Sequence, residues 1–133
     1  MSYRILWPAM RWPEERHIEE SSVAGHSAEF CERYADVTEE QWANCDAVVS
    51  VNDIPEEYRQ KMTKCRIFVT PKVGFDNIDG KAWADMGIPL CNVPDYGTQE
   101  VADHAMALML SLMKGITFHT RELKQDPRGL WRP

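Results

Sequence analysis

The chain has 133 residues, which is enough for one domain with a hydrophobic core and too few for two. Its 44% hydrophobic and 27% charged residues are ordinary for a globular protein. The net charge of −6 argues against a nucleic-acid partner, because such a partner requires a basic surface.

Short apolar runs alternate with helical segments along the chain, beginning with YRILW near the N-terminus. In the segment TEEQWANC, Thr38 and Gln41 form the sequence pattern of a capping box, which predicts a helix start. The predicted strands cover residues 3–7, 28–34, 46–51, 66–70 and 89–93, and the predicted helices cover residues 38–45, 55–64, 77–86 and 98–114. Strand, helix and strand in repetition predict an α/β fold, a parallel sheet with helices on both faces.

The predicted helix over residues 98–114 is apolar almost all round. Its apolar positions are Val101, Ala102, Ala105, Met106, Leu108, Met109, Leu110 and Leu112. A helix of this kind is expected to be buried between layers or between domains. Its methionines are interpreted as adaptable core packing rather than as a binding surface. His104 on the same helix is interpreted as structural, not catalytic.

The four cysteines, Cys31, Cys45, Cys65 and Cys91, lack the short spacing of a zinc site, so no metal site is predicted. The N-terminus MSYRILWPAM shows no secretory signal. The apolar stretch over residues 105–113 is too short to span a bilayer. We therefore expect free thiols and a cytoplasmic protein without a membrane partner.

The segment PKVGFDNID, residues 71–79, follows the carboxyl end of a predicted strand. Anionic ligands often bind there, because the first N–H groups of a helix lack intrahelical partners. Gly74 has no Cβ, so a carboxylate could approach the backbone at Val73 and Gly74, although a plain tight turn is the alternative. Lys72 either supplies a positive charge for the anion or is simply solvated. Asp76 and Asn77 are predicted to cap the following helix.

VGFDNID, followed by GIPLCNVPDYGTQEVADHAMALMLSLMKG, resembles the D-isomer-specific 2-hydroxyacid dehydrogenases. The branch related to C-terminal-binding proteins is the most similar, since NVPDY and VADHA are typical of it. The resemblance implies a flavodoxin-like or Rossmann-like substrate-binding domain over residues 1–116 and a hinge over residues 117–133. The hinge would lead to a dinucleotide-binding domain that carries the G-x-G-x-x-G loop and the catalytic residues. The seven glycines here never form G-x-G, so the nucleotide-binding signature is absent. The resemblance places the catalytic residues in the other domain, so none is expected in this chain.

As a function, the resemblance implies an NAD(P)-dependent oxidoreductase that interconverts a D-2-hydroxy acid and a 2-keto acid, with this chain inactive alone. It implies substrate contacts from Val73 and Gly74, and either a substrate contact or a loop-shaping role for Tyr96. Relatives usually have glycine at the position of Lys72, so a substrate contact from Lys72 is expected from its charge and not from the resemblance. Val73 and Val101 would contact NAD or NADP, which is bound mainly by the other domain. The implied partners are a small 2-hydroxy or 2-keto acid, the cofactor domain and a second copy in a homodimer.

The alternative is a stand-alone, non-catalytic binding or interaction module, as in the corepressor relatives of the same fold. A stand-alone module needs polar residues on the face where a partner domain would otherwise pack. The helix over residues 98–114 stays apolar, which favours the enzyme.

Overall fold

The computed structural model of the protein describes residues 1–126. The chain divides into two compact units, residues 1–94 and residues from 95 onward, and each is described by itself. The elements of the first unit are β1 (Arg4–Trp7), η1 (Pro13–Glu15), α1 (Arg16–Ser22), β2 (Ser27–Phe30), η2 (Tyr34–Asp36), α2 (Glu39–Asn44), β3 (Ala47–Val49), α3 (Glu56–Arg59), β4 (Ile67–Thr70), α4 (Gly80–Asp85) and β5 (Leu90–Asn92).

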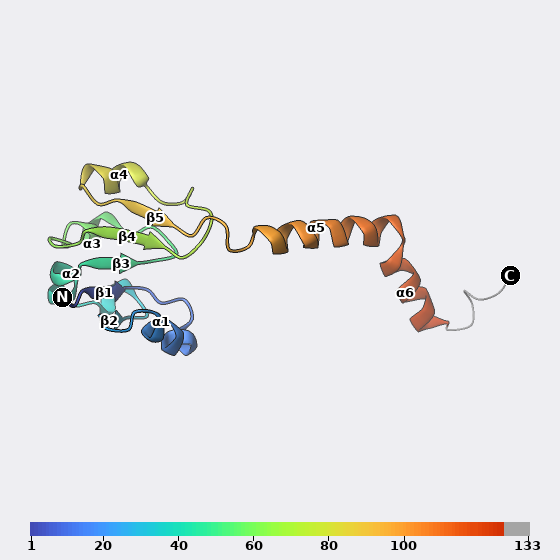
Figure 1. The fold of residues 1–133 in the computed structure, drawn as a ribbon, viewed down its shortest axis with the longest axis horizontal. Helices are drawn as coiled ribbons and strands as arrows, with labels where there is room; N and C mark the ends of the chain where they lie inside the picture. The colour runs from blue at the N-terminus through green and yellow to red at the C-terminus, as the bar shows by residue number, and fades with distance from the viewer. Residues whose placement is uncertain (127–133) are drawn as a thin grey trace. The chain divides into compact units, whose positions relative to one another are not determined.

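The first unit is built on one five-stranded sheet with the order β2-β1-β3-β4-β5 (Figure 1). All four strand pairs are parallel. This is the strand order of flavodoxin-like proteins, whose ligands bind outside the carboxyl ends of the strands. The predicted parallel sheet is therefore confirmed, and each of the five predicted strands is present in a shorter form.

The core lies on one face of the sheet. The register places Leu6 opposite Val48 and Val48 opposite Phe68, and these side chains are 1%, 0% and 0% exposed. Trp42 of α2 and Trp83 of α4 are fully buried in the same cluster. The Trp83 ring stacks on the Phe68 ring with centroids 4.5 Å apart. Burial of each such side chain stabilises the fold by about 1.5–3 kcal/mol. Helices α2 and α4, which supply the two tryptophans, therefore pack on this face of the sheet.

The opposite face carries α1. Trp7 and Phe30 are register partners on β1 and β2, and their rings stack with centroids 4.6 Å apart. The guanidinium of Arg16 on α1 lies 4.8 Å from the centre of the Phe30 ring. Helices on both faces are thus confirmed. Helix α1 was not predicted, because it buries no residue and has no apolar period to detect.

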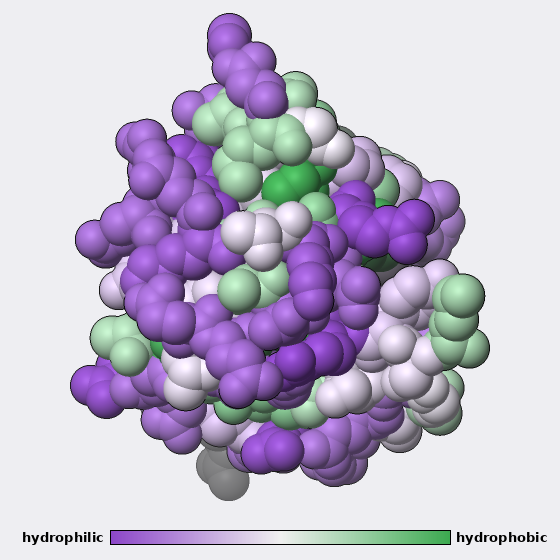
Figure 2. Space-filling view, turned by 90° about the vertical axis from the view of Figure 1, so that its left-hand side faces the viewer, coloured by the Kyte–Doolittle hydropathy of each residue, from purple (hydrophilic) through white to green (hydrophobic). Residues whose placement is uncertain are grey.

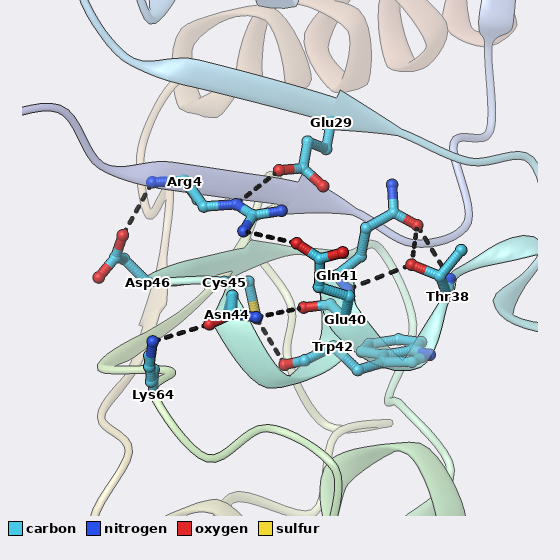
Figure 3. A network of polar contacts seen from close by, with 10 residues as sticks. All are labelled: Arg4, Glu29, Thr38, Glu40, Gln41, Trp42, Asn44, Cys45, Asp46 and Lys64. Atoms are coloured by element: carbon cyan, nitrogen blue, oxygen red, sulfur yellow. Dashed lines mark hydrogen bonds and ion pairs between the residues drawn. The ribbon is translucent and has the colours of Figure 1, made fainter.

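The start of α2 was predicted correctly from the sequence, whereas the start of α4 was not. The Thr38 capping box is confirmed: the Gln41 N–H donates to Thr38 Oγ1 at 3.2 Å, and the Thr38 N–H donates to Gln41 Oε1 at 2.9 Å (Figure 3). The capping role of Asp76 and Asn77 was wrong. Helix α4 begins at Gly80, and its N-cap is Asp79, whose Oδ1 accepts from the Ala82 N–H at 3.0 Å. Helix α3 is a single turn, shorter than the predicted residues 55–64.

The Asp53 carboxylate, in the loop after β3, joins three elements. Its Oδ1 accepts hydrogen bonds from the Trp83 indole and from the Ile54 N–H, both at 2.9 Å. Its Oδ2 accepts from the Asp79 N–H at 3.0 Å and pairs with the Arg59 guanidinium at 3.3 Å. This one side chain therefore connects the loop after β3 to α3 and to the start of α4.

The second unit contains α5 (Thr98–Met113) and α6 (Ile116–Gln125), with Gly115 between them in the left-handed region at φ 59°. No residue of α5 is buried, so the burial predicted for this helix and for His104 is not found within the described chain.

The predicted hinge, residues 117–133, is largely occupied by α6, and its residues 127–133 lie outside the described part of the chain. The predicted functional boundary at residue 116 stays a prediction. Helices long and apolar enough to cross a membrane are absent from residues 1–126.

Replacing Asp53 by Ala should lower the free energy of unfolding by about 2–4 kcal/mol, because several buried donors and Arg59 lose their acceptor. Urea unfolding followed by tryptophan fluorescence measures this loss. The matched control is Asp85→Ala, which removes a pair with Lys81 whose side chains are 65% and 83% exposed and should cost less than about 0.5 kcal/mol. Equal losses in the two variants would contradict the role given to Asp53.

Candidate functional site

The candidate site lies at the carboxyl edge of β3, β4 and β5. The turn over residues 71–79 follows β4, Asn52 and Asp53 follow β3, and Asn92 is the last residue of β5. Because the strands are parallel, their carboxyl ends meet at the same edge of the sheet, where α/β proteins bind ligands. The fold thus brings the predicted anion-binding turn together with polar residues of two neighbouring segments.

Neighbouring segments hold the turn in place. The Asn92 side-chain amide donates to the Val73 carbonyl at 2.8 Å, and the Val93 N–H donates to the Lys72 carbonyl at 3.2 Å. On the other side, the Asn77 amide donates to Asn52 Oδ1 at 3.4 Å. The contacts from Asn92 and Val93 engage the Val73 and Lys72 carbonyls and leave the N–H groups of Val73 and Gly74 free.

Within residues 1–126, the backbone N–H groups of Val73 and Gly74 donate to no protein atom. Val73 is 43% exposed and Gly74 is exposed as well, so a ligand can reach this part of the turn. Adjacent backbone N–H groups at a turn form a concave site for anions such as carboxylates. The turn therefore has the donors that the sequence predicted at Val73 and Gly74.

The fold itself does not require glycine at position 74. Its φ lies outside the left-handed region, and a Cβ built there would meet only Asp76 Oδ2, at an ordinary 3.7 Å. The missing side chain is therefore explained better by close approach of a ligand than by backbone strain.

Charged side chains surround the turn. The Lys72 ammonium donates to Asn77 Oδ1 and takes part in no ion pair within the described residues. Its charge is therefore not neutralised by a carboxylate of the chain. The Asp76 carboxylate, near Gly74, acts in the opposite direction and would repel an anion.

Arg11 is a further cation at the carboxyl edge of the sheet, and it was not predicted as a site residue. A narrow cavity of about 40 Å³ includes Arg11 and Trp12 together with Val49 and Pro71, so the loop after β1 reaches the first residue of the turn. The Arg11 guanidinium lies 4.8 Å from the centre of the Trp12 ring. The available signal was an arginine four residues after the end of the first strand, but no motif marks it.

The other two predicted site residues belong to the second unit. Tyr96 is 68% exposed and Val101 is 70% exposed. Val101 lies on α5 in a shallow depression that also includes Glu100, His104 and Leu108. Since the turn and these residues lie in separate units, the contacts predicted for Tyr96 and Val101 stay predictions. In residues 1–126, no group of three or more His, Cys, Asp or Glu side chains could hold a metal ion.

Comparison with known proteins identifies the family. A family model described as the D-isomer specific 2-hydroxyacid dehydrogenase catalytic domain matches residues 11–126. This match covers most of the chain, so the protein belongs to the D-isomer specific 2-hydroxyacid dehydrogenase family. The resemblance found in the sequence is confirmed.

Among its relatives is glyoxylate/hydroxypyruvate reductase B of Erwinia tasmaniensis, which is 28% identical over 98% of this chain and 39% of its own length. A glyoxylate reductase of Korarchaeum cryptofilum is 33% identical over 70% of this chain and 28% of its own length. An NADPH-dependent glyoxylate/hydroxypyruvate reductase from Sinorhizobium meliloti, solved with citrate, superimposes with a TM-score of 0.73 at 26% identity. That match covers 95% of this chain and 41% of the solved chain. The chain thus spans well under half the length of these relatives.

Gly74→Ala should change the free energy of unfolding by less than about 0.5 kcal/mol, because its φ is ordinary and the added Cβ has room. Gly87→Ala is the matched control. A Cβ there also has open space, but φ is +73°, so this variant should lose about 1–2 kcal/mol. Urea unfolding measures both. A larger loss at Gly74 than at Gly87 would show that the fold, rather than a ligand, requires the glycine of the turn.

Proposed function

We propose that this chain is the substrate-binding part of an NAD(P)-dependent oxidoreductase that interconverts a D-2-hydroxy acid and a 2-keto acid. The observation that carries the proposal is the pair of unpartnered N–H groups at Val73 and Gly74, in a turn at the carboxyl edge of a sheet of this family. The pair would bind the substrate carboxylate. Relatives named for glyoxylate and hydroxypyruvate support a small 2-keto acid as the substrate.

The contribution of this chain would be orientation. A carboxylate held by two fixed N–H groups directs C2 of the acid toward the nicotinamide, which supplies or accepts the hydride when bound. Lys72 and Arg11 would add positive charge at the mouth of the site, favouring anionic substrates. Tyr96 would either contact the substrate or shape its loop. We assign the role of catalytic acid or base to no side chain of the turn.

The cofactor would be NAD or NADP, held mainly by a domain outside this chain. Solved relatives include one with NADP and malonate and another with NAD and lactic acid. The residues present do not form a dinucleotide loop, because the seven glycines never occur as G-x-G and the loop after β1, residues 8–12, contains none. Val73 and Val101 would contribute only apolar contacts to the nicotinamide.

The exposed apolar residues of α5 would serve as the surface on which the cofactor domain packs. They include Leu108 at 54%, Leu112 at 81% and Met113 at 71% exposure. A patch of this kind disfavours the stand-alone interaction module, which would need a polar surface there. A homodimer through the same helix is the other arrangement that would cover it. We also propose a cytoplasmic location, in keeping with four free thiols.

Glyoxylate should bind the chain and shift the amide signals of Val73 and Gly74 in ¹H–¹⁵N NMR spectra. Gly74→Val should abolish these shifts, because the new side chain occupies the path of the carboxylate. The matched control is Gly80→Ala, where a Cβ would meet only Leu90 at 3.8 Å and binding should be unchanged. Lys72→Ala should weaken binding by up to about tenfold, as expected for the loss of one charge-assisted contact. Normal glyoxylate binding by Gly74→Val would refute the carboxylate role of the turn.

The chain alone should show no NADH or NADPH oxidation with glyoxylate, pyruvate or hydroxypyruvate, because it lacks a dinucleotide loop. A longer polypeptide that continues into a G-x-G-x-x-G domain should be active, and Gly74→Val should then lower kcat/KM by about 100-fold or more. Absorbance at the reduced nicotinamide band measures both. Turnover by the isolated chain would show that it holds the cofactor itself and would overturn the division of labour proposed here.

A further inference from the structure

Two segments, residues 43–49 and 63–69, run side by side at a constant offset. In the sheet, Ala47 pairs with Ile67. Before the strands begin, the Arg66 N–H donates to the Asp46 carbonyl at 2.9 Å. Two residues earlier, the Lys64 ammonium donates to Asn44 Oδ1 at 2.7 Å (Figure 3). The alignment of β3 and β4 therefore extends past their amino ends.

Cys45 and Cys65 lie within this alignment, between the Asn44–Lys64 and Asp46–Arg66 contacts. The two thiol groups interact electrostatically with each other. Neighbouring strands lie about 4.8 Å apart, which falls within the Cα separation of about 4.4–6.8 Å that a disulfide spans. The alignment therefore places the backbones of the two cysteines at a separation that a disulfide can span.

The two thiols differ in exposure and acidity. Cys45 is 2% exposed and donates to the Trp42 carbonyl at 3.4 Å, whereas Cys65 is half-buried and donates to the Ile67 carbonyl at 3.4 Å. The interaction with the neighbouring Cys45 thiol lowers the pKa of the Cys65 thiol. The interaction with Cys65, together with burial, raises the pKa of Cys45. Cys65 is therefore the more accessible sulfur and the one that more readily becomes a thiolate, which is the nucleophilic form.

We propose that Cys45 and Cys65 form a reversible dithiol–disulfide pair at the amino ends of β3 and β4, with Cys65 as the thiol that reacts first with a peroxide oxidant. Figure 2 faces this edge of the sheet, where much of the surface is hydrophilic. The candidate acid-binding turn follows the carboxyl end of β4, so the pair is a separate site and does not depend on the proposed function.

The chemistry balances with hydrogen peroxide as the oxidant. The Cys65 thiolate attacks one peroxide oxygen, the O–O bond breaks, and sulfenic acid and hydroxide form, the hydroxide taking up a proton to give water. The Cys45 sulfur then attacks the Cys65 sulfur, the S–O bond breaks, and a second water leaves. Two thiols lose two electrons and two protons in total, and one peroxide is reduced to two waters. A dithiol reductant reverses the bond by exchange.

Peptide mapping of the wild-type chain tests the proposal without any substitution. The folded chain is treated with hydrogen peroxide, remaining thiols are alkylated in denaturant, and the digest is analysed by mass spectrometry. We expect a Cys45–Cys65 cross-linked peptide with a mass loss of about 2 Da, reversed by dithiothreitol. Cys91 is an internal control because it is exposed, and Cys31 is another because burial raises its pKa. Both should remain alkylatable under the conditions that join the pair.

Two variants separate the roles of the sulfurs. Cys45→Ser should leave Cys65 as a sulfenic acid that dimedone captures, because no resolving thiol remains. Cys65→Ser should leave Cys45 as an unmodified thiol. Oxidation of Cys91 while Cys45 and Cys65 remain alkylatable would overturn the proposal, because reactivity would then follow exposure alone. A cross-link that joins Cys65 to Cys31 or Cys91 would overturn it as well.

Discussion

The Asp53 carboxylate is the constraint on which the functional edge of the sheet depends. It accepts hydrogen bonds from the start of α4 and from the Trp83 indole, and it pairs with Arg59 of α3. Helices α3 and α4 have only four and six residues, too few to be stable by themselves. Tertiary contacts must therefore hold them. Because Asp53 fixes the start of α4, it also fixes one end of the turn over residues 71–79.

The other side of that turn is fixed by β5. Asn92 donates to the Val73 carbonyl, so a side chain of the neighbouring strand holds the backbone while the N–H groups of Val73 and Gly74 point elsewhere. Because this part of the turn has engaged carbonyls and two free N–H groups, it is suited to an anion before any ligand arrives. Preorganisation of this kind is what an orientation site needs, since it avoids the cost of ordering the donors on binding. The opposite edge of the sheet carries the Cys45–Cys65 pair, so one register positions two chemically different sites.

Much of this arrangement could be predicted from the sequence. The five strands, the capping box at Thr38 and the position of the turn are confirmed, because each depends on a local pattern. The cap of α4 was assigned to Asp76 and Asn77, whereas Asp79 performs it, because the turn continues three residues further than the pattern suggested. Helix α1 and Arg11 were missed for a related reason: neither has a buried periodic face or a motif. The apolar pattern of α5 was identified correctly, but its burial is not found among the described residues.

The sequence by itself determined the α/β class, the family, and the glycine and lysine of the turn, because period, capping residues and motif order are all written within short segments. Only the tertiary structure decided that Asp53 reaches Trp83, that Asn92 holds Val73, and that Cys45 faces Cys65. These partners are 30, 19 and 20 residues apart, and nothing local distinguishes them from other residues of the same type. Strand register brings them together, since one parallel alignment sets every contact along two neighbouring segments at once.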